Sequence, residues 1–229
     1  KPSYIVNLDM RYEIFGDKGD IIAFSGFYKT FKDPIELTFF ASAPNQLTAR
    51  NLGSAKVYGA EFEIRKPLNF VSDDVKKWRF SLNASLIKSS LEMCEDEYKN
   101  RWNAARDGES ISRTRDLQGQ SPFLINSNIE FLNEDTGFQY GLFYNVQGRT
   151  LEVVGTGIVP DVYAVPFHSL NFNLKKFLDD DGKSSISLKA KNILSSKKKS
   201  VYESFNISDE IWTLRNQGIE FSVSYNLTF

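Results

Sequence analysis

The chain has 229 residues and nearly balanced charge, 28 lysines and arginines against 29 aspartates and glutamates. This balance argues against nucleic acid as a partner, because a nucleic-acid-binding protein usually carries a strong positive field. A single cysteine, Cys94, excludes an intrachain disulfide, and a single histidine, His168, excludes a metal site built on two histidines. We therefore expect no cofactor and no metal. No run of 18 apolar residues occurs, so we expect no transmembrane helix.

Nine segments alternate between apolar and polar residues with a period of two, the pattern of a β-strand with one apolar face. In the last of them, the odd positions from Ile219 to Phe229 are all apolar, and the even positions between them are not. In the second, the alternation is weaker, and we assign Phe24 and Tyr28 to the apolar face because the other parity would carry Lys29. In chain order the predicted strands cover residues 4–14, 21–30, 58–65, 78–86, 123–131, 138–147, 170–175, 186–191 and 218–229.

The connections between these strands alternate in length. Short polar turns are predicted at 16–20, 67–77, 133–137 and 179–183, and long loops at 32–53, 90–121, 150–163 and 195–213. Within the second long loop, residues 92–106 could form one or two helical turns but lack a sustained apolar stripe. An antiparallel meander of this kind has tight turns at one rim and large loops at the other.

Two architectures fit one apolar face: half of a soluble β-sandwich, or the wall of a transmembrane β-barrel. Strand length favours the barrel, because a tilted strand of about ten residues is long enough to cross a bilayer. The loop asymmetry and the aromatic residues near the short turns, such as Trp78 and Phe131, also favour it. Charges on the polar face, such as Glu61 and Glu63, require a wide and wet lumen. Because nine is odd and bacterial barrels have even strand numbers, the run is expected to have partner strands upstream.

Four stretches carry a family resemblance. The segment 51–62 is similar to an "N-x-G-x-A-x-x-x-G-x-E" strand entry, and 119–126 to a "G-Q-S-P-Y-x-x-N" strand start. The segment 189–194 resembles a "V-x-N-L-F/L" strand end, and 225–229 resembles an outer-membrane assembly signal that ends in Phe229. Ser224 departs from the glycine that this signal often has. Together the stretches resemble the C-terminal portion of TonB-dependent outer-membrane receptors, of the Bacteroidetes type.

The resemblance implies an all-β, transmembrane antiparallel β-barrel of 22 strands, of which residues 1–229 would form the C-terminal nine or so as one domain. The plug domain and the earlier strands are absent from the sequence. The implied function is TonB-energised uptake of a scarce nutrient, a siderophore, a vitamin or an oligosaccharide, across the outer membrane of a Gram-negative bacterium. Such a receptor makes no covalent change to its ligand and is not an enzyme. A passive porin or channel and a soluble β-sandwich binding module remain the alternatives.

The implied partners are the TonB complex, reached through the missing N-terminal region, and the outer-membrane assembly machinery. The lipid bilayer with its lipopolysaccharide, a surface lipoprotein, and a small-molecule or oligosaccharide ligand complete the set. Ligand contacts are expected in the long loops, where aromatic side chains can stack on rings and arginines can bind carboxylates or phosphates. The candidates are Tyr98, Arg101, Trp102, Arg113, Arg115, Tyr202 and Trp212. Tyr225, Leu227 and Phe229 are expected to form the assembly signal.

Overall fold

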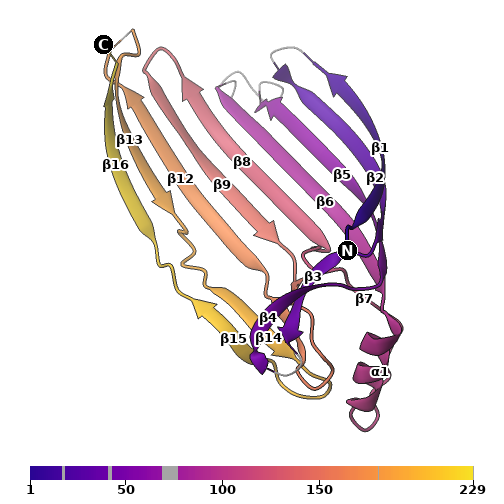
Figure 1. Cartoon of the computed structure of the whole chain (residues 1–229). Coiled ribbons are helices and arrows are strands. Elements are labelled where there is room, and N and C mark those ends of the chain that lie inside the picture. The colour runs from indigo at the N-terminus through magenta and orange to yellow at the C-terminus, as the bar shows by residue number, and fades with distance from the viewer. Residues whose placement is uncertain (17–18, 41–42, 69–76, 180, 229) are drawn as a thin grey trace.

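The computed structural model describes residues 1–16, 19–40, 43–68, 77–179 and 181–228. All nine predicted strands are present, and they form one curved antiparallel sheet in the order β1-β2-β5-β6-β8-β9-β12-β13-β16, with the short β7 paired to β6 (Figure 1). In the described part of the chain β1 and β16 are edge strands, so the sheet is open. The bounds are β1 Tyr4–Phe15, β2 Ile21–Lys32, β5 Ser54–Pro67, β6 Trp78–Glu92, β7 Thr114–Arg115, β8 Phe123–Asn133, β9 Phe138–Gln147, β12 Phe167–Phe177, β13 Ser184–Lys191 and β16 Glu220–Leu227.

The strand register gathers the apolar residues on one face of this sheet. Tyr12, Phe24 and Phe62 lie opposite one another across β1, β2 and β5, and the rings of Phe24 and Phe62 are 5.0 Å apart. Phe24 is 53% exposed, whereas its neighbour Ala23, on the other face, is 1% exposed. The assignment of Phe24 and Tyr28 to the apolar face is therefore confirmed.

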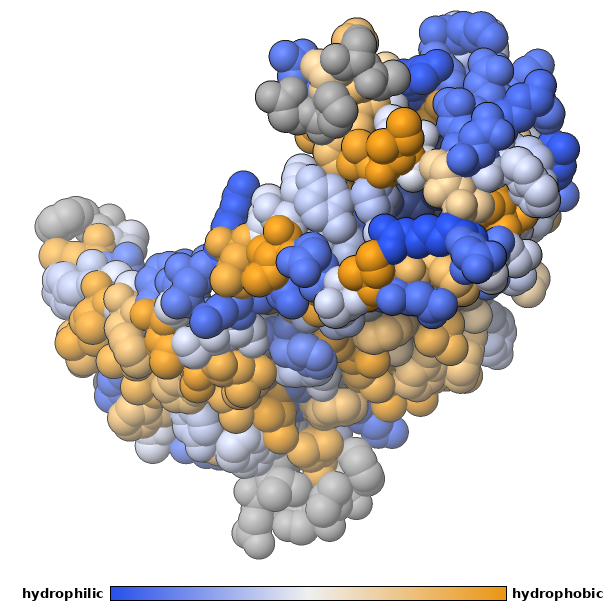
Figure 2. All heavy atoms as spheres, turned by 90° about the horizontal axis from the view of Figure 1, so that it is seen from below, coloured by the Kyte–Doolittle hydropathy of each residue, from blue (hydrophilic) through white to orange (hydrophobic). Residues whose placement is uncertain are grey.

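This outward face remains uncovered along the sheet. No second layer of described residues packs on it, and hydrophobic residues gather along one margin of the space-filling view (Figure 2). A soluble protein rarely exposes an apolar area of this extent, because its contact with water is unfavourable. The β-sandwich alternative is therefore wrong, and a lipid-facing wall accounts for the exposure.

Aromatic side chains lie on the outward face near the short turns, where the membrane–water interface of a barrel is expected. Trp78, Phe131 and Tyr140 form one cluster across β6, β8 and β9. The Trp78 ring lies 5.2 Å from Phe131 and 5.5 Å from Tyr140, centroid to centroid. The cluster fits an interfacial aromatic girdle.

The inward face of the sheet is polar. Arg11 of β1 forms an ion pair with Glu63 of β5 at 2.7 Å, so these two charges compensate each other across the strands. Asn83, Asn126 and Asn145 occupy one row across β6, β8 and β9, and the amide of Asn145 donates a hydrogen bond to Asn126. These asparagines line a shallow groove of about 280 Å³ on the inner wall. The inward face is thus suited to contact with water.

The long loops were predicted without strands, and this prediction is wrong. They contain β3 (Ile35–Phe40), β4 (Ala43–Asn51), β10 (Thr150–Val153), β11 (Asp161–Ala164), β14 (Lys198–Glu203) and β15 (Glu210–Arg215). The last four form a separate sheet in the order β10-β11-β14-β15, and β3 pairs with β4. Because hairpins from different loops complete each other's sheet, their pairing is not evident from local alternation.

One helix, α1 (Glu95–Asn103), follows β6 in the second long loop. Its nine residues exceed the one or two turns considered from the sequence. Glu95, Asp96 and Glu97 occupy its first turn and Arg101 its last, charges that favour the two ends of a helix dipole. These charges can thus stabilise the helix, although it lacks the apolar stripe by which most helices pack. Among the described residues, no helix is both long and apolar enough to span a membrane.

Gly53 forms the sharp connection between β4 and β5 that the resemblance placed in the "N-x-G" motif. Its φ is +59°, and a Cβ there would approach the carbonyl oxygen of Glu92 to 1.9 Å. Glycine is the residue that tolerates both conditions. The adjacent Leu52 is buried with Leu151 and Val154, so this turn also anchors the loops to the sheet.

Candidate functional site

The four long loops pack together beyond one rim of the sheet, at the lower end of Figure 1. Phe39 of β3, Val153 of β10 and Val162 of β11 share a buried cluster. The backbone of β3 also bonds to that of Val154, which follows β10: Val154 N–H donates to the carbonyl of Leu37 at 3.0 Å, and the Thr38 hydroxyl donates to Val154 at 2.9 Å. Because of these contacts, the loops form one packed assembly, which we call the loop assembly.

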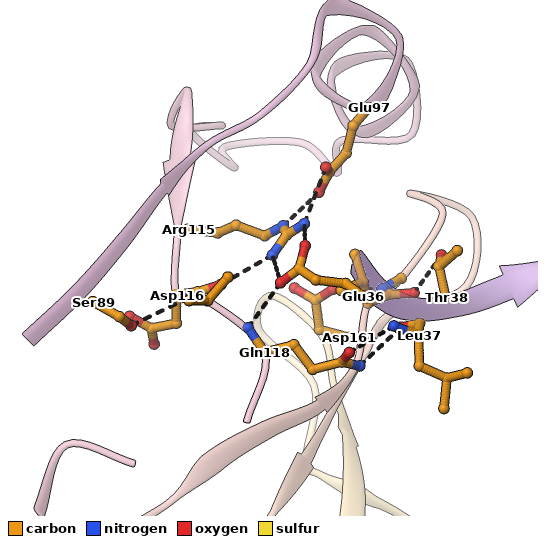
Figure 3. Close-up of polar contacts among 12 residues, drawn as sticks. Glu36, Leu37, Thr38, Ser89, Glu97, Arg115, Asp116, Gln118 and Asp161 are labelled. Atoms are coloured by element: carbon orange, nitrogen blue, oxygen red, sulfur yellow. Dashed lines mark hydrogen bonds and ion pairs between the residues drawn. The ribbon is translucent and has the colours of Figure 1, made fainter. Parts of the chain in front are cut away.

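A buried ion network lies at the centre of this assembly (Figure 3). The guanidinium of Arg115, in β7, donates two hydrogen bonds to the carboxylate of Glu36, in β3, at 2.7 and 3.0 Å. It also donates from Nε to Glu97 of α1 at 2.6 Å. The side chains of Arg115 and Glu36 are 6% and 2% exposed. Because two carboxylates occupy this guanidinium, it fastens α1 and β3 to the start of the segment that leads to β8.

A second arginine extends the network. Arg101 of α1 donates two hydrogen bonds to Asp161 of β11, at 2.7 and 2.9 Å, and one to Glu97 at 3.2 Å. The Gly155 N–H also donates to Asp161, at 2.7 Å. Glu97 therefore accepts from both arginines and joins the two pairs. The five side chains carry three negative and two positive charges.

The ion pairs of the network shift the pKa values of Asp161 and Arg115. Burial would raise the pKa of Asp161, but the hydrogen bonds and charge of Arg101, with the Gly155 amide, hold that pKa below its usual value. Burial likewise lowers the pKa of Arg115, and Glu36 and Glu97 outweigh it, so this pKa is raised. Paired charges thus offset the cost of burial, as buried ions require.

Gln118 supplies the neutral part of this junction. Its backbone N–H donates to Glu36 at 2.8 Å, and its side-chain amide donates to the carbonyls of Leu37 and Glu152 at 2.9 and 2.6 Å. The Leu37 N–H donates to the Gln118 side-chain oxygen at 2.6 Å. Gln118 therefore bridges the backbones of β3 and β10.

A cavity with a volume of about 690 Å³ opens beside the network. Its wall combines charged groups, which include Arg101, Arg106 and Glu109, with the aromatic rings of Tyr163 and Phe205. A second cavity of about 370 Å³ adjoins it and shares Ile158 and Val159. The larger one has the volume and the mixed polarity of a small-molecule site.

The structure distributes the seven predicted ligand-contact residues over three places. Arg101 and Arg115 belong to the buried network. Tyr98, Trp102 and Arg113 lie around α1, where the Arg113 guanidinium covers the Tyr98 ring at 4.1 Å and Trp102 is 59% exposed. Tyr202 and Trp212 pack on Phe39, with ring centroids 6.2 and 6.5 Å away.

Of these seven, Arg101 is in the described lining of the larger cavity. Ligand contact by any of them stays a prediction. The sequence reasoning did not single out Glu36, Glu97, Asp161 and Gln118, because their partners lie far away in the chain. Glu36 offered one signal, because it is the single charged residue in the mainly apolar stretch from Ile35 to Phe40.

The predicted assembly residues Tyr225 and Leu227 lie on the outward face of β16 and are exposed. They pair in register with Ile186 and Ser184 of β13, the neighbouring strand. Phe229 lies outside the described residues.

The open sheet, its lipid-suited outward face and its polar inward face define the wall of an outer-membrane β-barrel. The family model of the outer membrane protein beta-barrel family matches residues 1–225, and the chain belongs to this family. It is therefore an outer-membrane protein, as the resemblance implied. No curated protein sequence matches the chain significantly.

Solved structures support the fold. The chain is similar to the ferric yersiniabactin uptake receptor FyuA from Yersinia pestis, with a TM-score of 0.66 and 14% identity over 99% of this chain and 30% of that one. It is similar to the ferric citrate transporter FecA, with a TM-score of 0.67 and 10% identity over 99% and 31%. It is also similar to the outer membrane transporter YddB from Escherichia coli, with a TM-score of 0.61 and 16% identity over 100% and 33%. The chain thus spans about a third of the length of these proteins.

Proposed function

We propose that residues 1–229 form the C-terminal part of the barrel of a TonB-dependent receptor, whose plug and earlier strands belong to the rest of the protein. Three features support this proposal: the nine-strand wall, the motifs that resemble the receptor family, and the fit of the chain to a third of each transporter. The barrel would then have 22 strands, and a TonB complex would supply the energy through the missing N-terminal region. The wall would bind and pass a nutrient without covalent chemistry.

The cavity beside the ion network carries the functional part of the proposal. Arg106 offers an exposed positive charge at its wall, and Tyr163 and Phe205 offer ring faces. The guanidinium of Arg101, in the same wall, is already paired with Asp161 and Glu97. Arginine binds carboxylates and other anionic oxygens, and aromatic faces stack on planar rings. We infer that the nutrient is a compact anionic chelate, of which a ferric siderophore is the first candidate to test. Two of the structurally similar proteins are named for ferric ligands, the ferric yersiniabactin uptake receptor FyuA and the ferric citrate transporter FecA, which agrees with this choice.

A passive porin or channel is the second candidate. The polar inner wall, with its row of asparagines, would suit free diffusion of hydrated solutes. The two candidates differ in their need for energy. A porin needs only a concentration gradient, whereas a receptor of the proposed class stops importing when TonB or the proton gradient is removed.

The decisive experiment measures uptake of radiolabelled ferric siderophores by cells that express the full-length protein. We expect saturable uptake that disappears in a strain without TonB and after addition of a protonophore. An Arg106→Ala variant should bind the chelate more weakly, because it removes an exposed guanidinium from the cavity wall. The matched control is Lys197→Ala, which removes an exposed positive charge outside the described cavity lining.

Uptake that persists at the same rate without TonB would favour the porin. Binding unchanged by Arg106→Ala would remove the cavity from the proposal. A surface lipoprotein partner stays a prediction, which co-purification with the full-length protein would test.

A further inference from the structure

Three lysines stand out on the outward face of the sheet, at the rim where the long loops begin. Lys32 ends β2, Lys56 is the third residue of β5, and Lys88 lies near the end of β6. All three are exposed. The exposed apolar residues of the outward face are called the apolar belt below. Successive residues of a strand alternate between the two faces. Each lysine is an even number of positions from Tyr28, Tyr58 or Leu86 of the same strand, so the lysines lie on the face of the belt.

The register places these lysines on a diagonal across three adjacent strands. Tyr58 pairs with Tyr28 and Lys88, Lys56 with Thr30 and Ser90, and Lys32 with Ser54. Diagonal neighbours on adjacent strands are roughly 7–8 Å apart, a distance that the flexible lysine side chain easily covers. Neighbouring ammonium groups can therefore converge on one anionic group.

Charge at this place is not neutralised by the protein. In the described part of the chain, none of the three ammonium groups forms an ion pair. One carboxylate, Glu92, lies on the same face opposite Ser54, and its field acts on Arg113. Three positive charges against one negative charge leave the surface basic.

The position of the lysines relative to the apolar belt indicates which part of the membrane they contact. Tyr28 and Tyr58 are exposed on the same face and lie opposite each other in the strand register, at the end of the apolar belt that is nearest the long loops. Tyrosine prefers the membrane–water interface, so the lysines lie at the height of lipid headgroups. The outward positions at the same rim of β8, β12 and β16 are Phe123, His168 and Phe221, so the lysine cluster is local to β2, β5 and β6.

We propose that Lys32, Lys56 and Lys88 form a docking surface for the phosphate-bearing headgroup of an outer-leaflet lipid, with Tyr28 and Tyr58 beside its upper acyl chains. Lysines near an anionic membrane surface each contribute about fivefold to binding. The surface lies on the outside of the wall, so its function is independent of ligand import through the lumen.

The test uses the full-length protein in nonionic detergent, titrated with lipid A that carries both phosphates, and counts retained lipids by native mass spectrometry. We expect the triple variant K32Q/K56Q/K88Q to lose on the order of a hundredfold in affinity. The matched control is K29Q/K175Q/K189Q, which removes the same charge from the inward face of β2, β12 and β13. This control should bind as the unchanged protein does.

Further arms separate the possible sources of an effect. Dephosphorylated lipid A with the same acyl chains should bind weakly, and inorganic phosphate should compete poorly. The variant K32R/K56R/K88R should retain binding, which shows that charge rather than a fold change is responsible. Equal loss in both triple variants, equal binding of the dephosphorylated lipid, or full competition by inorganic phosphate would each overturn the proposal. Siderophore uptake should be unchanged in K32Q/K56Q/K88Q in cells with normal receptor levels, which separates this test from that of the import function.

Discussion

Arg115 and Glu36 are 79 positions apart in the chain and form two parallel hydrogen bonds in a nearly water-free setting. This pair joins the loop after β2 to the loop after β6. With Glu97 shared between Arg115 and Arg101, the same network reaches β11 and thus a third loop. The loop assembly therefore has a fixed base beside the cavity.

Removal of one partner from this pair should loosen the loops. Arg115→Met leaves Glu36 and Glu97 buried without their main partner, and such a loss costs about 3–5 kcal/mol. We expect faster cleavage within residues 90–121 when intact cells are treated with a protease. The sheet should stay folded, as judged by the mobility of the unheated protein in gel electrophoresis.

The control for Arg115→Met is Arg113→Met, because Arg113 pairs with Glu95 at 3.0 Å but both side chains are exposed. Exposed pairs contribute about 0–1 kcal/mol, so the cleavage rate should hardly change. If both variants accelerated protease cleavage equally, the buried pair would not stabilise the loops more than the exposed pair does.

Acidification should open the loops only at strongly acidic pH. The pKa of Asp161 lies below its usual value of about 3.9, so its contribution to stability is complete above that pH and is lost as the pH falls through the lowered pKa. Pepsin cleavage of the loops should therefore stay slow at pH 5 and accelerate below about pH 4. Asp161→Asn should show fast cleavage already at pH 5, and an unchanged profile would count against the network.

Gly53→Ala should destabilise the barrel wall severely. The new Cβ would overlap the Glu92 carbonyl oxygen, and alanine at φ +59° adds strain of about 1–2 kcal/mol. Gly119→Ala is the matched control, because Gly119 has φ +77° but no heavy atom within 4 Å of the position that a Cβ would take. The thermal midpoint in detergent should fall much further for Gly53→Ala, and a similar fall in both would attribute the effect to φ alone.

A charge in the centre of the outward face should block membrane assembly. Leu142 lies in the middle of β9, is exposed, and pairs with Ile129 and Phe172. Lysine at the bilayer midplane costs about 2–4 kcal/mol. We expect Leu142→Lys to reduce the amount of protein in isolated outer membranes. The inward control Asn83→Lys faces Glu63 in the register and should assemble normally; failure of both would place the inward face in lipid too.

The sheet could be predicted from the sequence because a wall between lipid and water imposes the same two-residue period on every strand. This local pattern located all nine strands and gave the correct face for Phe24 and Tyr28 in the least regular one. The loops obey no such rule. The hairpins β10–β11 and β14–β15 form one sheet through the pairing of β11 with β14, two strands that are far apart in the chain. Arg115 likewise reaches Glu36 only when the loops have folded together. The arginines were identified as important from residue type, whereas their partners depend on long-range contacts that one sequence does not reveal.

The row of Asn83, Asn126 and Asn145 along the inner wall has a consequence for anything that moves past it. Uncharged amides offer donors and acceptors in equal number, so a passing molecule can exchange one contact for the next at similar energy. The next position of this row, on β5, is Glu63, and its charge is paired with Arg11 of β1. At this height the inner wall therefore presents neutral amides beside a charge that is paired within the wall, so a passing solute meets hydrogen-bonding groups and a compensated ion pair.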